Sequence, residues 1–581
     1  MRTSRSPHHR STPRRSPRRS PLRTAPLTLT ALLTATAALS TQPLTAQTPA
    51  PGVHVFQPSS GTTTYVTDLA GNVVHSWPGT TRPGLAVYLA PNGDLVRTRF
   101  IANGPGGGGG GGAIERLTWD GDLLWQFNYT SATYHSHHDI ALMPNGNVLM
   151  IAWESIGAAG ATALGHDPAT LSTQFWSEEI IEIEPDGAGG ASVVWEWHAI
   201  DHVVQDFDAA LPDFGDPSAH PERIDINYPE AGPGFDGDWL HANGIDYEPD
   251  LDQIVLSLRT FSEIWVIDHS TTTAEAAGSI GGDAGRGGDL LYRWGNPAAY
   301  GRGTAADQQL FSQHDPQWIA PGLPGAGHLL VFNNGVGRPI GDASSAVELA
   351  PPLRADGTYE LLPGAPYGPA LPALELFHPV PTSFFSPTTS GTQRLANGNT
   401  LLVAGRTGEF IELDPSGQLV WALTHALGGP PRTFKARRVP GGVVGDATCV
   451  AALNSTGAPG ALHAVGSLRA SQNALTLWAQ DLPPDQFGFF LNANETGLVV
   501  GPGGSAGNLC LGGAIGRHNR AGEIFGAGAG GVGSLELDLT DLPRPSTVVA
   551  AVAGETWHWQ CWYRDTPGGS NFTNAIQVTL Q

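Results

Sequence analysis

The sequence has few charged residues, which make up 14% of its 581 positions, and only three cysteines and three methionines. Its abundant residues are glycine, with 76 copies, and proline, with 47. This balance disfavours long helices and favours many short strands separated by turns. A chain of this length also exceeds one ordinary hydrophobic core, so it needs several domains or a repeat architecture. We therefore expect an all-β protein.

The scarce cysteines, Cys449, Cys510 and Cys561, all lie near the C-terminal end of the sequence. None of them has the spacing of a CxxC redox motif or of a zinc site. One disulfide could form after export and would leave one thiol over. The sequence does not say which two cysteines pair.

Acidic residues are absent from the first 24 positions, which hold eight arginines, and an apolar run follows from Leu27 to Leu39. This is the layout of a signal peptide, and Leu44-Thr45-Ala46 offers a small residue for cleavage. The apolar run is too short to span a bilayer comfortably. We expect residues 1–46 to be removed and the mature protein, without a membrane span, to reach the periplasm, the cell surface or the medium.

Positive charge is scarce in the chain as a whole, because 30 Lys and Arg oppose 53 Asp and Glu, for a net charge of −23. A nucleic-acid partner is therefore not expected. An anionic substrate would also be repelled at long range. Any anion site must therefore depend on a local cluster of positive side chains.

Two short signatures recur between about residues 60 and 425. The first is an Asn-Gly or related turn that runs into an apolar strand, in PNGDLVRTR, PNGNVLMIAW, GAGHLLVFNN and ANGNTLLVAG. Asn-Gly accepts the positive φ that a tight hairpin needs. The second is an Asp-containing turn followed by an apolar strand that ends in tryptophan, at Trp77, Trp125, Trp195 and Trp421, with Trp294 as a fifth case.

Paired hairpin signals without helical periodicity are the pattern of propeller blades. We expect residues 47–430 to form a β-propeller of six blades, with insertions near residues 200–240, 270–310 and 340–385. The recurring tryptophans are expected to pack between neighbouring blades. The glycine run at 106–112 lacks the Lys-Ser/Thr and helix context of a phosphate loop, so we interpret it as a flexible loop.

The two signatures stop near Arg432, and the composition then changes to alternating Ala, Gly, Leu and Thr with the closing segment TWHWQCWYRD. We expect residues 431–581 to form a C-terminal β-sandwich that serves as an accessory module. Alternation along a strand would place Trp557, Trp559 and Cys561 on one face of it. The sequence does not choose between attachment, binding and stability as the role of this module.

Four short motifs place polar side chains beside apolar strands of the expected propeller. They are HSHHDIALMPNGN with His137 and His138, DWLHANGIDY with His241 and Asn243, SLRTFSEIWVID with Arg259, and FSQHDPQW with His314. The innermost strand of each blade lines the central channel, so these side chains are expected to converge there. An arginine beside several histidines makes a poor metal site and a good clamp for an oxyanion.

The order and spacing of these motifs resemble the arylsulfotransferase family of bacterial periplasmic propeller enzymes. The shared features are HHD before an NGN hairpin, W-x-H-x-N followed 18 residues later by Arg259, and QH before an apolar strand. The resemblance covers roughly residues 52–430. It implies transfer of a sulfuryl group from a phenolic sulfate ester to another phenol, without a nucleotide, cofactor or metal, through a sulfohistidine intermediate.

The resemblance implies that His314 is the nucleophile and that His138, His241 and Arg259 bind or protonate the sulfuryl and phenolic oxygens. His137 and Asn243 are added as substrate-binding residues. Neighbours on a strand face opposite sides, so only one of His137 and His138 should point into the channel. For the same reason Asp139 and Asp315, which directly follow histidines, are expected to point away from them.

Two other functions fit the residues. In the first, His138, His241 and His314 bind zinc or another divalent ion that activates water. In the second, the propeller is a non-catalytic platform for binding at the cell surface. Retained activity in EDTA would exclude the first, and absence of transfer with any aryl sulfate would favour the second. Oligomeric state cannot be read from the sequence.

Overall fold

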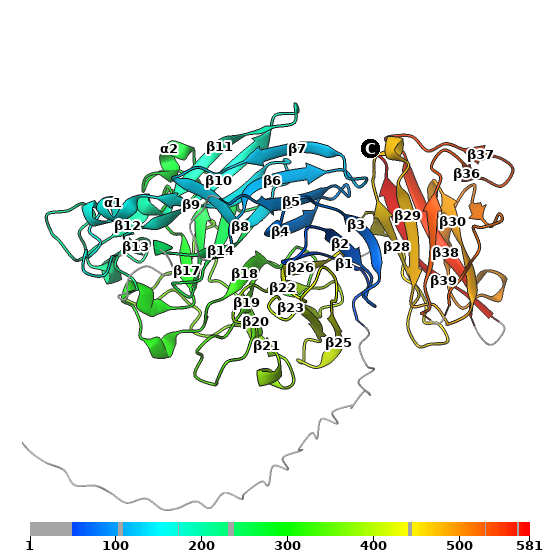
Figure 1. Cartoon of the computed structure of the whole chain (residues 1–581). Helices are drawn as coiled ribbons and strands as arrows, with labels where there is room; N and C mark the ends of the chain where they lie inside the picture. The colour runs from blue at the N-terminus through cyan, green and yellow to red at the C-terminus, as the bar shows by residue number, and fades with distance from the viewer. Residues whose placement is uncertain are drawn as a thin grey trace, which may run out of the picture. The chain divides into compact units, whose positions relative to one another are not determined.

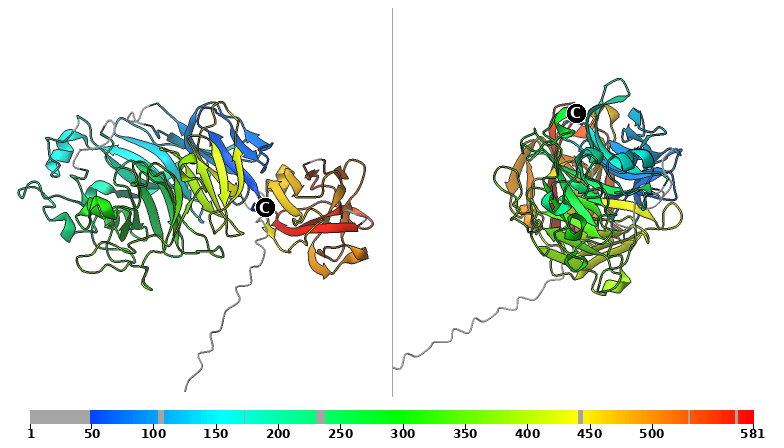
Figure 2. Two further views of the ribbon diagram at one scale, coloured as in Figure 1. Left: turned by 90° about the horizontal axis from the view of Figure 1, so that it is seen from below. Right: turned by 90° about the vertical axis from the view of Figure 1, so that its left-hand side faces the viewer.

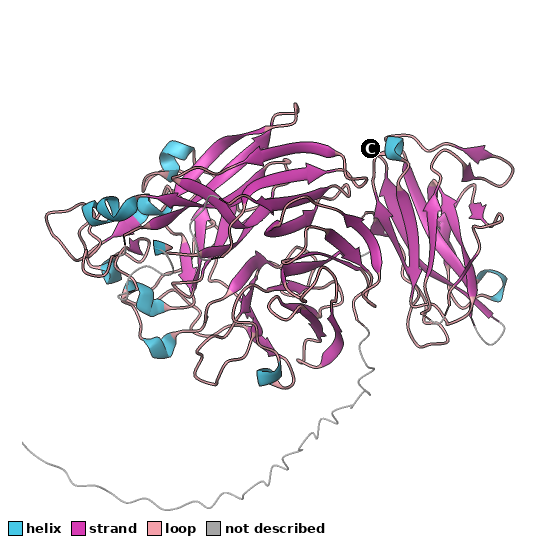
Figure 3. Cartoon of the chain, in the orientation of Figure 1, coloured by secondary structure: helices cyan, strands magenta, loops and turns pink. Residues whose placement is uncertain are grey.

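The computed structural model describes residues 49–102, 108–171, 173–229, 237–439, 444–528, 530–565 and 569–581. The expected signal peptide and its cleavage point lie outside these residues. Strands make up most of the regular structure, and helices such as α1 (Gly157–Ala163) and α2 (Thr273–Ala276) are short (Figure 3). A search of the described residues found no helix with the length and hydropathy needed to cross a bilayer.

Residues 53–439 form six four-stranded antiparallel sheets, labelled in Figure 1 and seen from two further directions in Figure 2. In spatial order the first three sheets are β26 (Thr433–Val439), β1 (Val53–Pro58), β2 (Thr64–Thr67), β3 (Val73–Trp77); then β4 (Pro83–Leu89), β5 (Leu95–Phe100), β6 (Gly112–Leu117), β7 (Leu123–Asn128); then β8 (Tyr134–Leu142), β9 (Val148–Ser155), β10 (Trp176–Pro185), β11 (Ala191–His198).

The next three sheets follow the same order along the chain. They are β14 (Ala242–Glu248), β15 (Gln253–Leu258), β16 (Glu263–Asp268), β17 (Tyr292–Trp294); then β18 (His314–Trp318), β19 (Leu329–Asn333), β20 (Ser345–Leu349), β21 (Leu374–Phe377); then β22 (Gly391–Arg394), β23 (Thr400–Ala404), β24 (Glu409–Leu413), β25 (Leu419–Thr424). A parallel bridge between β12 (Val203–Val204) and β13 (Ile224–Asp225) lies in the insertion before β14.

The first strand of each sheet contacts the first strands of its two neighbours, in the cyclic order β26, β4, β8, β14, β18 and β22. The ring closes because β26, from the end of this region, pairs with β1 from its beginning. The fold is therefore the all-β propeller that the sequence predicts. The propeller extends to Val439, beyond the expected boundary at residue 430, because β26 is needed to complete the first sheet.

The recurring turns and tryptophans have the places that the repeat predicts. The turn glycines Gly93, Gly146, Gly327 and Gly398 join the first and second strands of their sheets with φ of +82° to +95°. Trp77, Trp125, Trp195, Trp294 and Trp421 lie in the outermost strands. Four of their indole N–H groups donate across to the following sheet, to Thr118 O, Thr271 Oγ1, Pro369 O and Leu69 O. These side chains fasten neighbouring sheets together.

The last part of the chain forms a second all-β region. One sheet contains β27 (Asp446–Ala447), β39 (Gly569–Thr579), β38 (Thr556–Asp565), β30 (Phe487–Ala493), β33 (Gly516–His518) and β34 (Phe525–Gly526), and another contains β28 (Ala461–Gly466), β29 (Leu475–Gln480) and β35 (Gly533–Leu537). Two smaller pairs are β31 (Glu495–Val499) with β32 (Leu509–Gly512), and β36 (Leu542–Pro543) with β37 (Val548–Val549).

The two larger sheets of this region share one apolar core, as a sandwich requires. Trp557, Trp559 and Cys561 of β38 all enter this core, which is the shared face that strand alternation predicts. Trp562, on the opposite face, packs instead beside Cys510 and Leu511 in a separate apolar cluster.

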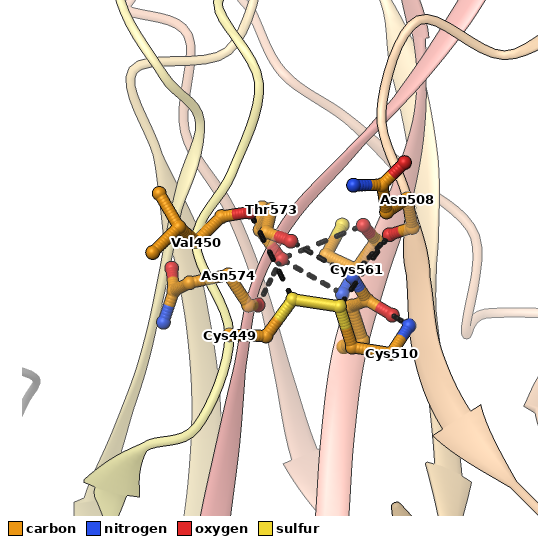
Figure 4. Close-up of a disulfide and its surroundings, with 8 residues drawn as sticks. Cys449, Val450, Asn508, Cys510, Cys561, Thr573 and Asn574 are labelled. Carbon is orange, nitrogen blue, oxygen red and sulfur yellow. Dashed lines mark hydrogen bonds between the residues drawn. A yellow bond between two sulfur atoms is a disulfide. The ribbon is translucent and has the colours of Figure 1, made fainter. Parts of the chain in front are cut away.

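A disulfide joins Cys449 to Cys510, and the third cysteine, Cys561, is buried as a free thiol (Figure 4). The bond closes a loop with a sequence separation of 61 residues, and such a cross-link restricts the unfolded chain. We expect reduction with dithiothreitol, or Cys449→Ser, to lower the stability of the C-terminal region by about 2–4 kcal/mol. Thermal unfolding followed with and without reductant measures the change. An unchanged unfolding curve after verified reduction would contradict it.

A buried group of charges lies among the first strands of the propeller. Lys435 on β26, the only lysine of the sequence, contacts Asp139 Oδ2 at 2.6 Å and Asp315 Oδ1 at 3.0 Å. Arg437 binds both oxygens of Asp315 at 2.5 and 2.7 Å, and Tyr88 donates to Asp139. Asp139 and Asp315 therefore point away from the histidines that precede them, as predicted. The network ties β4, β8 and β18 to the closing strand β26.

Candidate active site

A cavity of about 550 Å³ collects side chains from several sheets of the propeller. Its size is within the range of small-molecule sites. Its lining includes Ser59, Ser60, Leu85, Gly108, Gly109, His138, Asp238, His241, Arg259, Thr260, His314, Thr388, Thr389, Gly405, Arg406, Arg432 and Thr433. The four residues predicted to be catalytic are all in this cavity, although 176 positions of sequence separate His138 from His314.

Irregularities in the first strands hold these side chains at the cavity. The pairing register shifts in β8 between Ser136 and Ile140, and in β18 between His314 and Gln317. His138 has φ +50° and His241, directly before β14, has φ +51°. A non-glycine residue in this left-handed region costs about 1–3 kcal/mol and is found most often at functional sites. The local strain redirects these imidazoles out of the regular strand alternation.

Both ring nitrogens of His314 make hydrogen bonds. Nδ1 lies 2.7 Å from Asn334 Oδ1 and 3.2 Å from Ser312 O. The amide nitrogen of Asn334 donates to Ser386 O and Thr389 O, so its Oδ1 is the atom that faces His314. Two acceptors at Nδ1 require a proton there, which leaves the lone pair on Nε2. Nε2 accepts from Thr389 N at 3.1 Å at the cavity wall.

Burial keeps this imidazole uncharged. It lowers the pKa of His314 to about 3, assisted by the positive charge of Arg259 and opposed by the hydrogen bond to Asn334. A neutral ring with its lone pair on the nitrogen at the cavity is the form that can act as a nucleophile near pH 7.

His241 is oriented by a carboxylate that the sequence analysis did not single out. Its Nδ1 lies 2.6 Å from Asp238 Oδ2, and the other oxygen of Asp238 accepts from Trp153 Nε1 at 3.1 Å. The ring centroids of His241 and His138 are 4.7 Å apart. The motif DWLHANG thus supplies both a histidine and its orienting acid, three residues apart, and this spacing was the signal that could have revealed Asp238.

Only one of the two adjacent histidines lines the cavity. His138 does so, whereas His137 lies behind it, stacked on Trp153 with ring centroids 3.8 Å apart. His137 Nδ1 lies 2.8 Å from His138 Nδ1, and His137 Nε2 lies 2.7 Å from Glu178 Oε2. The expectation that His137 binds substrate is therefore corrected, because the ring is buried behind His138.

Asn243 requires the same correction. Its side chain is fully buried and its Nδ2 donates to Gln313 O at 2.9 Å, on the residue before His314. It is not among the residues that line the cavity. Since Ala242 and Gly244 flank a register shift in β14, the asparagine turns toward β18 and braces the neighbouring strand.

Three arginines give the cavity a local positive charge in a chain that is acidic overall. Arg259 follows β15 and is half-buried, and its backbone N–H donates to His241 O at 3.2 Å. Arg406 and Arg432 are exposed at the cavity. Arg259 was predicted, and the other two were missed because they lie in loops outside the four motifs. This is the cluster that an anion site needs against a net charge of −23.

The described part of the glycine run is packed rather than free. Gly109 O accepts from His138 N at 2.8 Å, and Gly111 N donates to Ser136 O at 3.0 Å. A Cβ on Gly109 would lie 1.9 Å from the His138 ring, and φ at Gly109 is +87°. The interpretation as a flexible loop is therefore wrong for residues 108–112. Glycine is needed there because the backbone approaches the histidine so closely.

The aromatic side chain nearest to two of the histidines is Phe434, with ring centroids 5.9 Å from His138 and 6.4 Å from His314. Trp239, Trp318, Phe311, Tyr88 and Phe384, which the sequence offered as candidates for a phenol-binding wall, are not part of the cavity lining. Phe434 follows the last recurring signature on β26, so the repeat pattern did not point to it.

Metal-ligand geometry occurs elsewhere among the described residues. Glu154, Glu179 and His198, on the third sheet, form a group whose donor atoms lie within 4.8 Å of one another. The cavity histidines have other partners at Nδ1, which are Asp238 for His241, Asn334 for His314 and His137 for His138. Together with Arg259 this donor set fits an oxyanion better than a cation.

Comparisons with solved structures find matches at low similarity, one of which is described as a β-propeller domain. A protein of unknown function from Bacteroides caccae has 11% identity and a TM-score of 0.37, covering 67% of this chain and 98% of that one. Virginiamycin B lyase from Staphylococcus aureus has 11% identity and a TM-score of 0.30, covering 64% and 86%. The β-propeller domain of Cps50 (Swd1) from Myceliophteria thermophila has 11% and 0.34, covering 64% and 89%.

A search of curated proteins found no match to this sequence. The family model described as Arylsulfotransferase (ASST) matches residues 119–349. This stretch contains His138, His241, Arg259 and His314, all of which line the one cavity described above. Over these residues the chain is similar to arylsulfotransferases, which supports the resemblance that the four motifs indicate.

Proposed function

We propose that this protein transfers a sulfuryl group from an aryl sulfate ester to a phenolic acceptor through a sulfohistidine on His314. The observation that supports this most is the neutral His314 ring with its lone pair on Nε2, beside Arg259 in one cavity. A covalent intermediate divides one difficult transfer into two similar steps.

In the first step, Nε2 of His314 gives up its hydrogen bond from Thr389 N and attacks sulfur; the N–S bond forms and the S–O bond to the donor breaks. Nδ1 keeps its proton, so Asn334 and Ser312 O stabilise the positive charge that develops on the ring. In the second step the acceptor oxygen attacks sulfur, and the electron pair of the N–S bond returns to Nε2.

Arg259 offers forked donors to the sulfuryl oxygens, which carry the negative charge through both steps. His138 and His241 lie beside it, and one of them has to protonate the departing phenolate and later accept the proton of the incoming phenol.

The direct test is incubation with p-nitrophenyl sulfate and a phenolic acceptor, with p-nitrophenolate and the sulfated acceptor both quantified. We expect equal amounts of the two products and double-displacement kinetics. Release of nitrophenolate and free sulfate without a sulfated acceptor would indicate a hydrolase instead. Absence of turnover with every aryl sulfate would leave the non-catalytic binding function in place.

Removing the guanidinium group of Arg259 should weaken substrate binding and lower the rate of transfer. We expect Arg259→Ala to lower kcat/KM by about 10²–10³-fold, because one charged donor to the transferring group is lost. Arg259→Lys should recover only part of this, since an ammonium group cannot make forked contacts. Arg354→Ala, at an exposed ion pair with Glu360, is the control and should match the wild type. Wild-type kinetics in Arg259→Ala would contradict the role of the guanidinium.

Chelation separates sulfuryl transfer from the metal-dependent alternative. We expect full activity after dialysis against EDTA, because the proposed steps use imidazole and guanidinium groups only. Metal content measured on the same dialysed sample checks that removal was complete. Loss of activity on dialysis and its return with Zn²⁺ would favour a metal-dependent hydrolase.

We also propose that the protein acts outside the cytoplasm. The Cys449–Cys510 disulfide supports this, because structural disulfides persist mainly in oxidising compartments. Fractionation of cells that express the full chain, followed by N-terminal sequencing, tests both export and cleavage near Ala46. Accumulation of an unprocessed cytoplasmic form would contradict it.

A further inference from the structure

Three buried side chains form a continuous hydrogen-bonded line that ends at the cavity. Glu178 on β10 contacts His137 Nε2 at 2.7 Å, and His137 Nδ1 contacts His138 Nδ1 at 2.8 Å. The side chains of Glu178 and His137 are 1% and 0% exposed. The second oxygen of Glu178 accepts from Ala242 N at 2.7 Å, so the carboxyl group cannot rotate freely. The reaction steps described above leave Glu178 and His137 without a function.

This line couples the proton on Glu178 to the proton on His138. If Glu178 is ionised, His137 Nε2–H donates to it, His137 Nδ1 accepts, and His138 Nδ1–H donates to His137. His138 Nε2 is then a proton acceptor at the cavity. If Glu178 is protonated, every bond reverses, and His138 carries its proton on Nε2. The same two rings thus present either a base or an acid, depending on one buried carboxyl group.

We propose that Glu178, His137 and His138 form a proton relay in which Glu178 stores the proton exchanged with the phenolic oxygen between the two half-reactions. This inference rests on the proposed sulfuryl transfer and assigns its acid–base chemistry to His138 rather than to His241. Glu178 and His137 are positioning and relay residues, and His138 is the group that meets the substrate.

The relay supplies the proton that the first step needs and takes up the proton that the second step releases. When the donor S–O bond breaks, its phenolate takes the proton from His138 Nε2. His138 Nδ1 takes a proton from His137 Nδ1, and His137 Nε2 takes one from Glu178, which becomes a carboxylate. When the acceptor phenol attacks sulfur, its proton enters at His138 Nε2 and the transfers run backward to Glu178. Both histidines stay neutral in each resting state, and only their tautomers change.

The surroundings of the relay favour the protonated form of the Glu178 carboxyl group. Burial raises the pKa of Glu178 well above its usual value, and the negative charges of Asp238, Glu154 and Glu179 act in the same direction. The Ala242 N–H acts in the opposite direction. Burial also lowers the pKa of His137 and of His138, assisted by the charges of His241, His314 and Arg259 around His138. Neutral imidazoles are what such a relay needs.

The two half-reactions should therefore have opposite pH limbs. The free enzyme needs a protonated Glu178, so kcat/KM for the aryl sulfate donor should fall as the pH rises through the pKa of Glu178. The sulfated enzyme needs an ionised Glu178, so kcat/KM for the acceptor should fall as the pH decreases through the same region. Both profiles are measured on the wild-type full chain with phenyl sulfate as donor. If kcat/KM for the donor and kcat/KM for the acceptor changed in the same direction with pH, the relay would be wrong.

Glu178→Gln should remove both pH dependences, that of kcat/KM for the donor and that of kcat/KM for the acceptor. The amide can donate to His137 Nε2 and accept from Ala242 N, so the line of hydrogen bonds survives while proton storage is lost. We expect kcat with phenyl sulfate to fall by about 10²-fold or more at nearly constant KM. The loss in kcat/KM for p-nitrophenyl sulfate, which reports the first half-reaction alone, should be much smaller, because its phenolate is stable enough to depart without a proton. Glu184→Gln, an exposed glutamate on the same strand β10, is the matched control with wild-type kinetics expected.

The outcomes separate the relay from the proposed function. If the wild type transfers sulfuryl groups and Glu178→Gln does so equally well with both donors, the relay is wrong and the transfer stands. If Asp238→Asn removes the pH limbs and Glu178→Gln does not, the proton passes through His241 instead, which also overturns the relay. If the wild type shows no transfer, the proposed function itself fails. Should Glu178→Gln not fold, the wild-type pH profiles remain a complete test.

Discussion

Replacing His314 with alanine should abolish sulfuryl transfer, with kcat lowered by about 10⁴-fold or more. The reason is that Nε2 of this ring is the group that receives the sulfuryl group, and no neighbouring side chain can take its place. His138 is held at Nδ1 by His137, with which it exchanges a proton, and His241 is held at Nδ1 by Asp238. The assay is p-nitrophenolate release with and without a phenolic acceptor.

The same variant separates covalent from direct transfer. Wild-type protein incubated with donor alone should gain the mass of one SO₃ group on the peptide that contains His314, and His314→Ala should not. His198→Ala, on the third sheet and outside the cavity, is the control and should label normally. Transfer that persists in His314→Ala, or labelling at another residue, would remove His314 from its proposed role.

Replacing Lys435 with methionine should lower the free energy of unfolding of the propeller by about 3–5 kcal/mol. The ammonium group is buried between Asp139 and Asp315, and its removal leaves both carboxylates with less compensation in the interior. Methionine keeps most of the volume, so the effect measures charge rather than packing. Urea unfolding followed by tryptophan fluorescence reports the change, since the propeller tryptophans lie between its sheets.

The pH dependence and a second variant check that charge is the cause. Burial would raise the pKa of Asp315, but the charges of Arg437 and Lys435 hold it at about 2. A lowered carboxyl pKa contributes stability that is present above about pH 4 and lost as the pH falls toward 2. The difference between wild type and Lys435→Met should therefore shrink in acid. Lys435→Met combined with Asp139→Asn should recover part of the loss. An equal loss at every pH would indicate a packing defect instead.

Much of the fold could be predicted because it is encoded locally. Asn-Gly and Asp-containing turns specify hairpins whatever surrounds them, and their repetition predicts a propeller. Trp77, Trp195, Trp294 and Trp421 could likewise be placed, because each lies in the last strand of its repeat. The predicted end of the propeller was too early, because β26 belongs to the first sheet. It pairs with a strand almost 400 residues away, and the residues of β26 themselves do not indicate such a distant partner.

The candidate site could likewise be predicted only in part from local sequence patterns. The four side chains that line the cavity, His138, His241, Arg259 and His314, stand out in the sequence because ionisable residues interrupt apolar strands. Strand alternation alone could not show which of His137 and His138 faces the cavity, or where the side chain of Asn243 points. The register shifts in β8 and β14 break that alternation, and they depend on how neighbouring strands meet.

The sequence by itself determined the all-β class, the repeating sheets and the residue types that could handle an oxyanion, because turn chemistry and strand patterning act over a few residues. Only the tertiary structure decided which groups hydrogen-bond to those residues on the side away from the cavity. Glu178, which contacts His137, and Asn334, which contacts His314, come from other strands or segments. A hydrogen bond between such partners depends on a distance of a few ångströms, and closure of the ring sets that distance.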